Sequence, residues 1–414
     1  MAVKIKNLAI ANYRQFRDVI FDFTEPTTGV PLRRVCLIGG NGTGKSTALR
    51  ALWAALGPPN LSIGPETVAE FTNGITSWCR EANLNPFSEQ GRPVTDLELE
   101  LSRTPCLNCR PDSELTPIGK QITDVPDTNL NNALGSLKAP SNRIEVGQDS
   151  IAAFWTNLIA LIKDREAGWL SFQKLPQNKD RTVRELEEEY FASHPDILKE
   201  LADFWNVILE RASLEFDYEG ASVPIQLTDN LKAYIRLREG KGKIAYADLS
   251  TGIRHFIFRL GHIFTVFRGD PSQEGIILVD EPENSLHPDF LFDLVSFYEQ
   301  AAPGAQLFMA THSPIVAAQF RPEERFILEF EESGGVSIRR GVSPEGDDPN
   351  DVLLRDFAVR TLYGKKGLEQ WRRFRELDRK IQQEPDSAIR RSLMKEYMEI
   401  GRTYNFAPEH EIPA

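Results

Sequence analysis

The stretch Gly39-Gly40-Asn41-Gly42-Thr43-Gly44-Lys45-Ser46 decides the fold of this chain of 414 residues. It has the full phosphate-loop pattern, in which a glycine and four variable residues precede Gly-Lys-Ser. The preceding residues, Arg33 to Ile38, are mostly apolar and predict a β-strand. Apolar residues then recur at helical spacing, namely Leu49, Leu52, Trp53 and Leu56. Because a phosphate loop requires a strand before it and a helix after it, the stretch predicts a nucleotide site.

The glycines of this loop allow successive backbone N–H groups to point at phosphate oxygens, together with the N-terminus of the following helix. Lys45 is expected to neutralise the β- and γ-phosphates of ATP, and the Ser46 hydroxyl is expected to bind Mg²⁺. We therefore expect ATP and Mg²⁺ as cofactors. The residues expected to bind the nucleotide are Gly39, Asn41, Gly42, Thr43, Gly44, Lys45, Ser46 and Thr47.

A second motif follows Gly275. The run Ile276-Ile277-Leu278-Val279 is apolar throughout, as expected for a strand that is buried on both faces of a parallel sheet. Asp280 comes next, at the carboxyl end of the strand where α/β sheets present ligands, and is expected to bind Mg²⁺. Glu281 is expected to accept a proton from the attacking water, a role that contributes roughly 10²- to 10⁴-fold to a rate.

A third motif, Ala310-Thr311-His312-Ser313, ends the next predicted strand, which covers residues 306–310. Because neighbouring parallel strands end at the same edge of a sheet, His312 should lie beside Glu281 and sense or polarise the γ-phosphate. Glu281 and His312 are therefore the candidate catalytic residues. The alternative for His312 is a purely structural histidine.

A fourth motif, Leu249-Ser250-Thr251-Gly252, begins a predicted helix over residues 252–267. A serine hydroxyl and unpaired N–H groups at a helix start suit an anion, so Ser250 and Gly252 are candidate nucleotide-binding residues. A simple helix cap is the alternative.

Strands alternate with helices through the second half of the chain, which predicts an α/β fold with a parallel core. We also expect antiparallel pairs, and therefore a mixed sheet, from residues 3–23, 232–247 and 325–340. Further predictions are a strand at 95–101, no regular structure at 104–146, helices at 149–167, 183–194, 195–214 and 289–301, and tail helices at 351–402.

These patterns predict three parts. The nucleotide-binding domain is discontinuous and comprises residues 1–58 and 230–345. An insertion at 59–229 is expected to be irregular at first and then helical. Residues 346–414 are expected to form a helical C-terminal tail.

The four motifs follow one another in the order found in ABC-type ATPases. Residues 1–58 and 230–330 resemble the ABC-type P-loop ATPases of the SMC, RecF and OLD-like group, often filed as AAA-type ATPases of bacterial defence systems. Asn12-Tyr13-Arg14-Gln15-Phe16 and Asp280-Glu281-Pro282-Glu283-Asn284-Ser285-Leu286-His287-Pro288 also carry the resemblance. It implies an ABC-type fold in which Arg14 approaches the nucleotide. It further implies a homodimer or higher homo-oligomer in which Ser250 and Gly252 reach the γ-phosphate bound to the opposite subunit.

Composition limits the possible partners. The formal net charge of −12 argues against a surface that binds nucleic acid throughout. No apolar stretch approaches the ~20 residues that span a membrane, and the N-terminus lacks a signal-peptide core, so we expect a cytoplasmic protein with no membrane contact. Basic residues in the tail form either a local nucleic-acid patch or a solvated helix face. They are Lys365, Lys366, Arg372, Arg373, Arg375, Arg379 and Lys380.

Four cysteines are too few for a disulfide scaffold. Cys106 and Cys109 form a single Cys-x-x-Cys pair. The pair is either half of a zinc site completed by other ligands, such as those of a second subunit, or a reduced pair in a loop.

OLD-type nucleases of the group that the chain resembles continue into a metal-dependent Toprim domain, which needs an Asp-x-Asp strand end. Glu345-Gly346-Asp347-Asp348 lies instead in a loop rich in proline and glycine. We therefore expect a separate effector protein, nuclease-like, as in the two-gene antiphage systems Septu and PARIS. The resemblance implies an ATPase that regulates this effector in antiphage defence.

Two other functions remain open at this point. One is a DNA-binding ATPase of the SMC or RecF type that acts in repair or chromosome maintenance. The other is a transporter ATPase, which is disfavoured because transporters carry Asp where this chain has His287, and Gln or Glu where it has Ile253.

Overall fold

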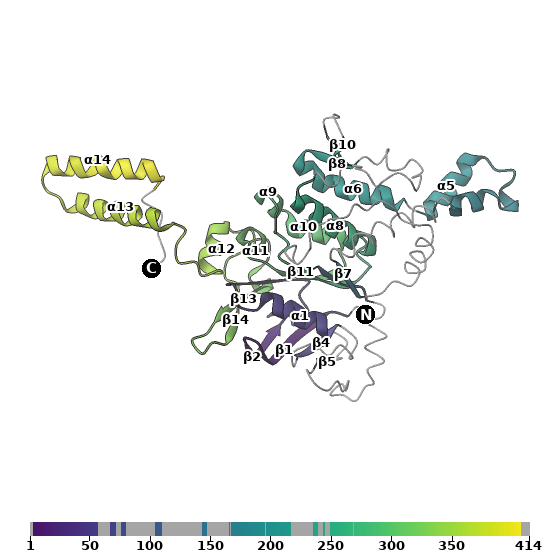
Figure 1. The fold of residues 1–414 in the computed structure, drawn as a ribbon, viewed down its shortest axis with the longest axis horizontal. Helices are drawn as coiled ribbons and strands as arrows, with labels where there is room; N and C mark the ends of the chain where they lie inside the picture. Colours follow the sequence, from purple (N-terminus) through teal and green to yellow (C-terminus); the bar gives the residue numbers. More distant parts are fainter. Residues whose placement is uncertain are drawn as a thin grey trace.

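The computed structural model describes residues 3–56, 67–71, 76–79, 104–109, 143–146, 165, 167–194, 196–216, 235–238, 243–244, 249–267 and 269–406. These residues form two larger β-sheets, a small third sheet, and helices on both sides of the largest sheet (Figure 1). The predictions for residues 95–101 and 149–164 lie outside the described residues.

A seven-stranded sheet forms the centre of the molecule, in the order β14-β13-β3-β12-β11-β6-β7. All neighbouring strands run parallel except β13 and β14, which form an antiparallel hairpin. The predicted α/β fold with a mixed sheet is confirmed. The strands are β3 (Arg34–Gly39), β6 (Cys106–Cys109), β7 (Arg143–Val146), β11 (Gly275–Asp280), β12 (Ala305–Ala310), β13 (Arg325–Phe330) and β14 (Val336–Arg340).

Helix α1 (Lys45–Ala55) lies between the central sheet and an antiparallel sheet of order β2-β1-β4-β5 (Figure 1). It is buried because its alanines and leucines contact both sheets. Gln306 of β12 also joins the sheets, since its side-chain amide bonds the N–H and the carbonyl of Ile5 at 2.8 and 2.9 Å. The antiparallel strands are β1 (Ile5–Tyr13), β2 (Phe16–Asp22), β4 (Thr67–Phe71) and β5 (Thr76–Cys79).

The opposite face of the central sheet is covered by α6 (Ile197–Leu209), α8 (Thr251–Phe267) and α10 (Leu294–Ala301). The indole N–H of Trp205 on α6 donates to the carbonyl of Ile257 on α8 at 3.0 Å. The two helices approach closely because α8 has Gly261 beneath this indole, where a Cβ would lie 2.5 Å from the ring. Within the described part of the chain, no helix combines the length and apolarity that would cross a membrane.

Most helices and strands predicted around this core are present. The predicted helix at 183–194 is α5 (Val183–Ser193), which begins at a capping box between Thr182 and Glu185. The predicted hairpin at 232–247 is confirmed by β9 (Ile235–Leu237) and β10 (Lys243–Ile244), and β8 (Leu214–Phe216) adds a third strand. The single helix predicted at 289–301 is divided into α9 (Pro288–Leu291) and α10.

The expectation of no regular structure at residues 104–146 is wrong at both ends of that range. Strands β6 and β7 pair in parallel with each other, and β6 pairs with β11, so both extend the central sheet. Strands β4 and β5 likewise extend the N-terminal sheet. Residues between 59 and 229 therefore contribute strands to both sheets, in addition to helices α5 and α6.

The C-terminal part is helical, as predicted, with α11 (Pro314–Ala317), α12 (Pro349–Arg355), α13 (Lys365–Gln383) and α14 (Ser387–Tyr404). Helices α13 and α14 form a hairpin that extends away from the two large sheets (Figure 1). The hairpin has its own apolar cluster around Trp371, Phe374 and Phe406. It is tied across by Arg373 of α13 and Glu396 of α14, whose side chains form two hydrogen bonds of 2.9 and 3.1 Å.

A fully buried ion pair connects the start of β13 to the end of α12. The Arg325 guanidinium lies 3.1 Å from the Asp356 carboxylate, and neither side chain is exposed. Asp356 also accepts a hydrogen bond of 2.9 Å from the N–H of Val342. This carboxylate therefore holds the segment after β14 against the central sheet.

We expect the substitution Asp356→Ala to lower the free energy of unfolding by about 3–5 kcal/mol, because it leaves Arg325 as an unpaired charge in the interior. The matched control is Glu188→Ala, which breaks an exposed pair with Arg184 on α5 and should cost no more than about 0.5 kcal/mol. Urea denaturation followed by circular dichroism measures both. Equally small effects would contradict a supporting role for the buried pair.

Candidate functional site

The phosphate loop leaves the central sheet at the end of β3 and enters α1. Its backbone takes positive φ values at Gly39, Gly42 and Gly44. At Gly44, where φ is 107°, a Cβ would lie 2.3 Å from the Gln15 side chain and 2.6 Å from the Phe16 ring. Only glycine satisfies both the conformation and the space at this position. The side chain of Gln15 also donates to the carbonyl of Gly42 at 3.0 Å, so the β1–β2 turn braces the loop.

Lys45 lies inside the loop and is buried. Its ammonium donates to the carbonyls of Gly39 and Gly40 at 2.9 and 3.1 Å. Burial lowers the pKa of Lys45 to about 8, against the opposing effect of the negative charges of Asp280, Glu281 and Glu283. The lysine therefore remains mainly protonated at pH 7, and three carboxylates lie within electrostatic range of it.

Asp280 and Glu281 lie at the carboxyl end of β11. Asp280 is buried, and the N–H of Glu281 donates to the carbonyl of Ala310 in the next strand at 2.9 Å. Glu281 has a φ of 47°, a left-handed conformation that is uncommon for a residue with a side chain. Its carboxylate accepts a hydrogen bond of 2.7 Å from the side-chain amide of Asn284. The chain thus turns sharply after the buried strand and holds the Glu281 carboxylate at the sheet edge.

His312 lies at the same edge, after β12. Burial lowers the pKa of its imidazole, the charge of Lys45 lowers it further, and Glu281 opposes this shift. The lowered pKa favours the neutral imidazole, which lies within electrostatic range of both residues. The N–H of His312 donates to the Glu283 carboxylate at 2.6 Å. The structure brings together Lys45, Asp280, Glu281 and His312, as the three motifs predict.

The fourth motif begins helix α8. Ser250 is exposed, and its hydroxyl accepts a hydrogen bond of 3.4 Å from the N–H of Ile253, as in a helix cap. Gly252 is buried against the turn that follows Glu281, since a Cβ at this position would lie 2.0 Å from the carbonyl oxygen of Ser285. The cap geometry is present, and nucleotide binding by Ser250 and Gly252 stays a prediction.

Arg14 is exposed, with its guanidinium 5.3 Å from the centre of the Tyr13 ring. Its role in nucleotide binding stays a prediction. In the same turn, the side chain of Gln15 forms a hydrogen bond with the phosphate loop. Residue-by-residue reasoning missed Gln15, Glu283 and Asn284. All three lie inside the sequence elements that carry the family resemblance, but only their contacts identify them.

Mg²⁺ normally binds through one or two protein oxygens together with phosphates and water. Asp280 at the strand end and Ser46 in the first turn of α1 supply one carboxylate and one hydroxyl at this sheet edge, which fits such a site. In the described part of the chain, no cluster of three or more His, Cys, Asp or Glu residues suits a metal held by protein alone.

The zinc interpretation of Cys106 and Cys109 is wrong, and so is their placement in a loop. Both lie in β6, where residues three apart point to opposite faces of the sheet. Cys106 is buried in the core on the α1 side, and Cys109 is buried in the core on the α8 side. Burial also raises the pKa of the Cys106 thiol to about 12. The two sulfur atoms therefore cannot bind one metal ion.

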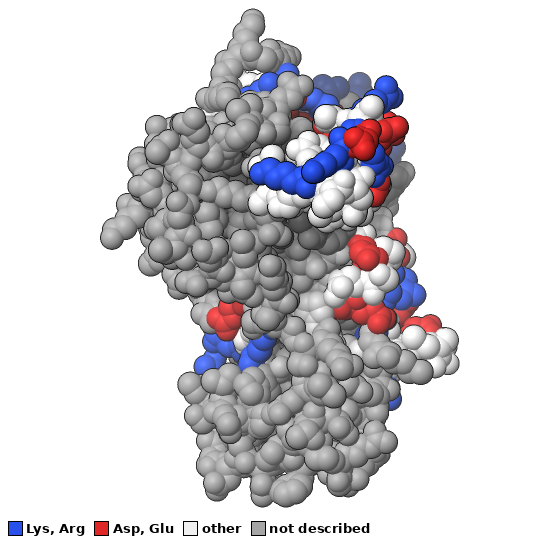
Figure 2. All heavy atoms as spheres, turned by 90° about the vertical axis from the view of Figure 1, so that its right-hand side faces the viewer, with Lys and Arg blue, Asp and Glu red and all other residues white. Residues whose placement is uncertain are grey.

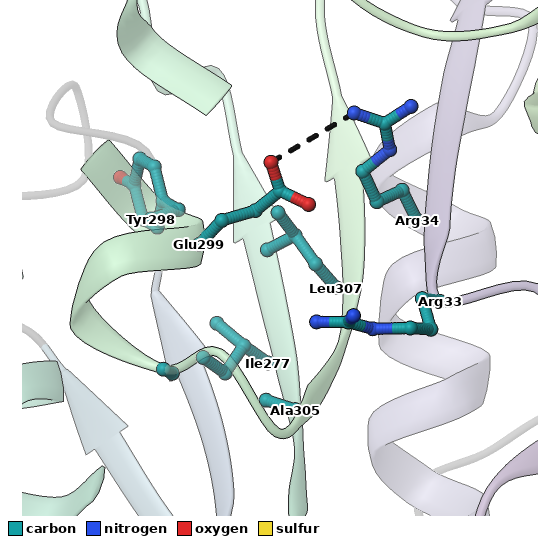
Figure 3. A pocket seen from close by; sticks show the side chains of 8 residues that line it. Arg33, Arg34, Ile277, Tyr298, Glu299, Ala305 and Leu307 are labelled. Carbon is teal, nitrogen blue, oxygen red and sulfur yellow. Dashed lines mark ion pairs between the residues drawn. The ribbon is translucent and has the colours of Figure 1, made fainter. Parts of the chain in front are cut away.

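At the opposite edge of the central sheet, the described side chains pack closely around a small cavity. Arg33 and Arg34, Glu299, and side chains of β11 and β12 surround a cavity of about 10 Å³ there, which leaves room for no more than a water molecule (Figure 3). Arg34 lies 3.8 Å from Glu299 across it and 2.8 Å from Glu324. These ion pairs connect the amino end of β3 to α10 and to the residue before β13.

The surface around α5 carries both signs of charge. Lysines and arginines lie next to aspartates and glutamates there (Figure 2), and Arg181 pairs with Glu189 at 2.6 Å. Among the described residues of this face, the charges form no patch of a single sign. This arrangement is typical of a solvated helix surface.

Comparison with known proteins supports nucleotide chemistry. Residues 119–318 match the family described as AAA domain, putative AbiEii toxin, Type IV TA system, and residues 3–83 match the AAA ATPase domain. The chain is also 19% identical over 417 positions to the Retron Vc95 probable ATPase of Vibrio cholerae serotype O1 biovar El Tor. That match covers 85% of this chain and 78% of the relative.

The solved structures that are similar to this chain include two with a TM-score of 0.41 each. One is the Smc head bound to the C-winged helix domain of ScpA, with 10% identity and coverage of 81% of this chain and 97% of that chain. The other is the Smc head domain with an extended coiled coil bound to the C-terminal domain of ScpA derived from Pyrococcus furiosus, with 13% identity and coverage of 82% and 96%.

We expect Lys45→Ala to weaken ATP binding by at least about 10-fold, because removal of a charge that contacts phosphate costs more than about 1.4 kcal/mol. Fluorescent ATP-analogue titration measures this effect. Lys365→Ala, which removes an exposed lysine at the start of α13, is the matched control and should bind normally. Normal affinity of the Lys45 variant would contradict the phosphate-loop assignment.

Proposed function

We propose, for a chain that carries AAA-type ATPase domains, that it binds and hydrolyses ATP as an ABC-type ATPase and regulates a separate effector in antiphage defence. One observation carries the proposal. Lys45, Asp280, Glu281 and His312 come from three different strand ends and meet at one edge of the central sheet. The combination of a phosphate-binding lysine, a metal-binding aspartate and a candidate base suits ATP hydrolysis.

Each of these residues has a proposed role. Lys45 binds the β- and γ-phosphates, while Ser46 and Asp280 hold Mg²⁺, which neutralises charge that develops on the phosphate oxygens. Glu281 accepts the proton of the attacking water. His312, whose lowered pKa favours the neutral imidazole, donates a hydrogen bond to the γ-phosphate. Asn41 and Gly42 in the loop are exposed, so the loop is accessible to a nucleotide on this side.

We further propose that two copies of the chain share each ATP. Ser250 is exposed at the start of α8, a position from which it can face another subunit. The N-terminus of this helix attracts negative charge and has unpaired N–H groups, which suits a γ-phosphate presented by a partner. The proposed assembly is therefore a homodimer, or a larger homo-oligomer built from such dimers.

The defence role rests on similarity to the retron-associated ATPase. The proposed effector is a separate nuclease-like protein. The hairpin of α13 and α14 is the proposed attachment site, because it extends from the body and its apolar cluster is separate from the cores of the sheets. Such a hairpin can bind a partner without disturbing the nucleotide site.

The second candidate function is a DNA-binding ATPase of the repair or chromosome-maintenance type. Lys365, Arg372 and Arg379 favour it, because they recur every seven residues and so follow one face of α13. All three are exposed, and none has an acidic partner among the described residues. A row of this kind suits a phosphate backbone, although it also suits an acidic protein surface.

We expect Glu281→Gln to bind ATP with near-normal affinity and to hydrolyse it at least about 10²-fold more slowly, because the amide cannot accept the proton. If two subunits share each ATP, this variant should also accumulate as an ATP-dependent dimer. Phosphate release measures turnover, and light scattering measures mass. Normal turnover would show that a residue other than Glu281 is the base. A variant that stays monomeric at saturating ATP would contradict the proposal that two subunits share each ATP.

The defence and repair proposals differ in their partner. The defence proposal expects the purified chain to bind duplex DNA weakly and to co-purify with the product of a neighbouring gene. The repair proposal expects duplex binding that falls steeply between about 50 and 200 mM salt. It also expects this binding to weaken in a Lys365→Glu, Arg372→Glu, Arg379→Glu variant. Fluorescence anisotropy with a labelled duplex distinguishes the two.

A further inference from the structure

We infer that Glu283 and Asn284 are positioning residues for ATP hydrolysis, because they hold His312 and Glu281 in place through direct hydrogen bonds. The inference rests on the proposed function and extends it to two residues that do not themselves touch the phosphates.

Both residues belong to the turn that follows β11. The N–H of Asn284 donates to the carbonyl of Glu281 at 3.3 Å, and the N–H of Leu286 donates to the carbonyl of Glu283 at 3.2 Å. Glu281 and Ser285 both have left-handed backbone conformations, with φ values of 47° and 61°. Such conformations cost free energy and persist where surrounding contacts determine them. The turn is therefore a defined structure with a fixed shape.

Glu283 connects this turn to the end of β12. Its carboxylate accepts the hydrogen bond of 2.6 Å from the N–H of His312, which lies 29 residues further along the chain. A charge-assisted bond of this kind is stronger than one between neutral groups. It fixes the backbone from which the imidazole projects, and so fixes the distance between the ends of β11 and β12.

The position of Glu283 is costly, which argues that the contact matters. Its side chain is largely buried, and the groups that hydrogen-bond its carboxylate include the N–H of His312 and the hydroxyl of Thr311. Burial raises the pKa of this carboxyl, and the negative charge of Glu281 raises it further. A buried carboxylate beside a second carboxylate destabilises a fold unless other contacts compensate. Here the hydrogen bonds from His312 and Thr311, together with the nearby charge of Lys45, compensate in part.

Asn284 acts on the other candidate catalytic residue. Its side-chain amide donates to the Glu281 carboxylate at 2.7 Å, which limits the rotation of that carboxylate. Asn284 carries no charge, so it orients Glu281 without neutralising it. A single turn therefore positions both Glu281 and His312 through hydrogen bonds, and neither of these two hydrogen bonds is made to Lys45.

The test is a split between kcat and KM in steady-state ATP hydrolysis by the full-length chain. We expect Glu283→Ala to lower kcat by about 10- to 100-fold, since a displacement near 1 Å has effects of this size, while KM changes by less than about 3-fold. Glu283→Gln keeps an acceptor for the His312 N–H and should recover kcat to within about 5-fold of the wild type. Asn284→Ala should lower kcat by about 10-fold with an unchanged KM.

The matched control is Glu274→Ala, which removes an exposed glutamate before the opposite end of β11 and should leave kcat and KM unchanged. Wild-type kcat in Glu283→Ala would overturn the inference, and so would a Gln variant as slow as the Ala variant. If Glu283→Ala fails to fold, the kcat of Asn284→Ala becomes the test. Wild-type kcat in Asn284→Ala would then overturn the inference.

Glu281→Gln separates this inference from the proposed function. If Glu281→Gln turns over normally, the proposed hydrolysis site itself is wrong. If it is inactive while Glu283→Ala and Asn284→Ala both have wild-type kcat, the hydrolysis site stands and only the positioning role is lost.

Discussion

The register between three parallel strands is the constraint on which the rest of the site depends. Asp280 of β11 lies opposite Ala310 of β12, and Ala310 lies opposite Leu37 of β3. The last hydrogen bonds between these strands run from the N–H of Glu281 to the carbonyl of Ala310, and from the N–H of Thr311 to the carbonyl of Leu37. The polypeptide therefore leaves the sheet at the same edge after each of these three strands. A shift of one residue in either pair would reverse the faces of the side chains and separate the carboxylates from Lys45.

Much of this arrangement could be predicted from sequence because its determinants are local. The glycine loop, the apolar run before Asp280 and the polar residues after residue 310 each define a strand end without knowledge of the fold. Strands β6 and β7 were missed because each has four residues, too few for a recognisable period. The error at Cys106 and Cys109 has the same origin. Their spacing suggests a metal-binding pair, but in strand β6 the two side chains point to opposite faces of the sheet.

The contacts of Glu283 and Gln15 could not be predicted from the sequence, because each joins residues that are far apart in the chain. Gln15 bonds a loop 27 residues away, and Glu283 bonds a residue 29 positions away, so no local pattern contains either pair. Both become visible only when sheet topology places the turns together. In this chain, sequence motifs predict which chemical groups approach the phosphates, whereas tertiary structure identifies the groups that hold them.

The close fit of Gly252 against Ser285 affects how genetic data on this protein would be read. Under the proposed shared site, a mutation in the motif from Leu249 to Gly252 would act on the ATP bound to the neighbouring subunit. Here even a methyl group at position 252 would press on the backbone that carries Glu281 and Glu283 in the same chain. If two subunits share each ATP as proposed, a phenotype from position 252 would combine a defect within the chain and a defect in its partner, whereas a change at the exposed Ser250 side chain would mainly report the defect in the partner.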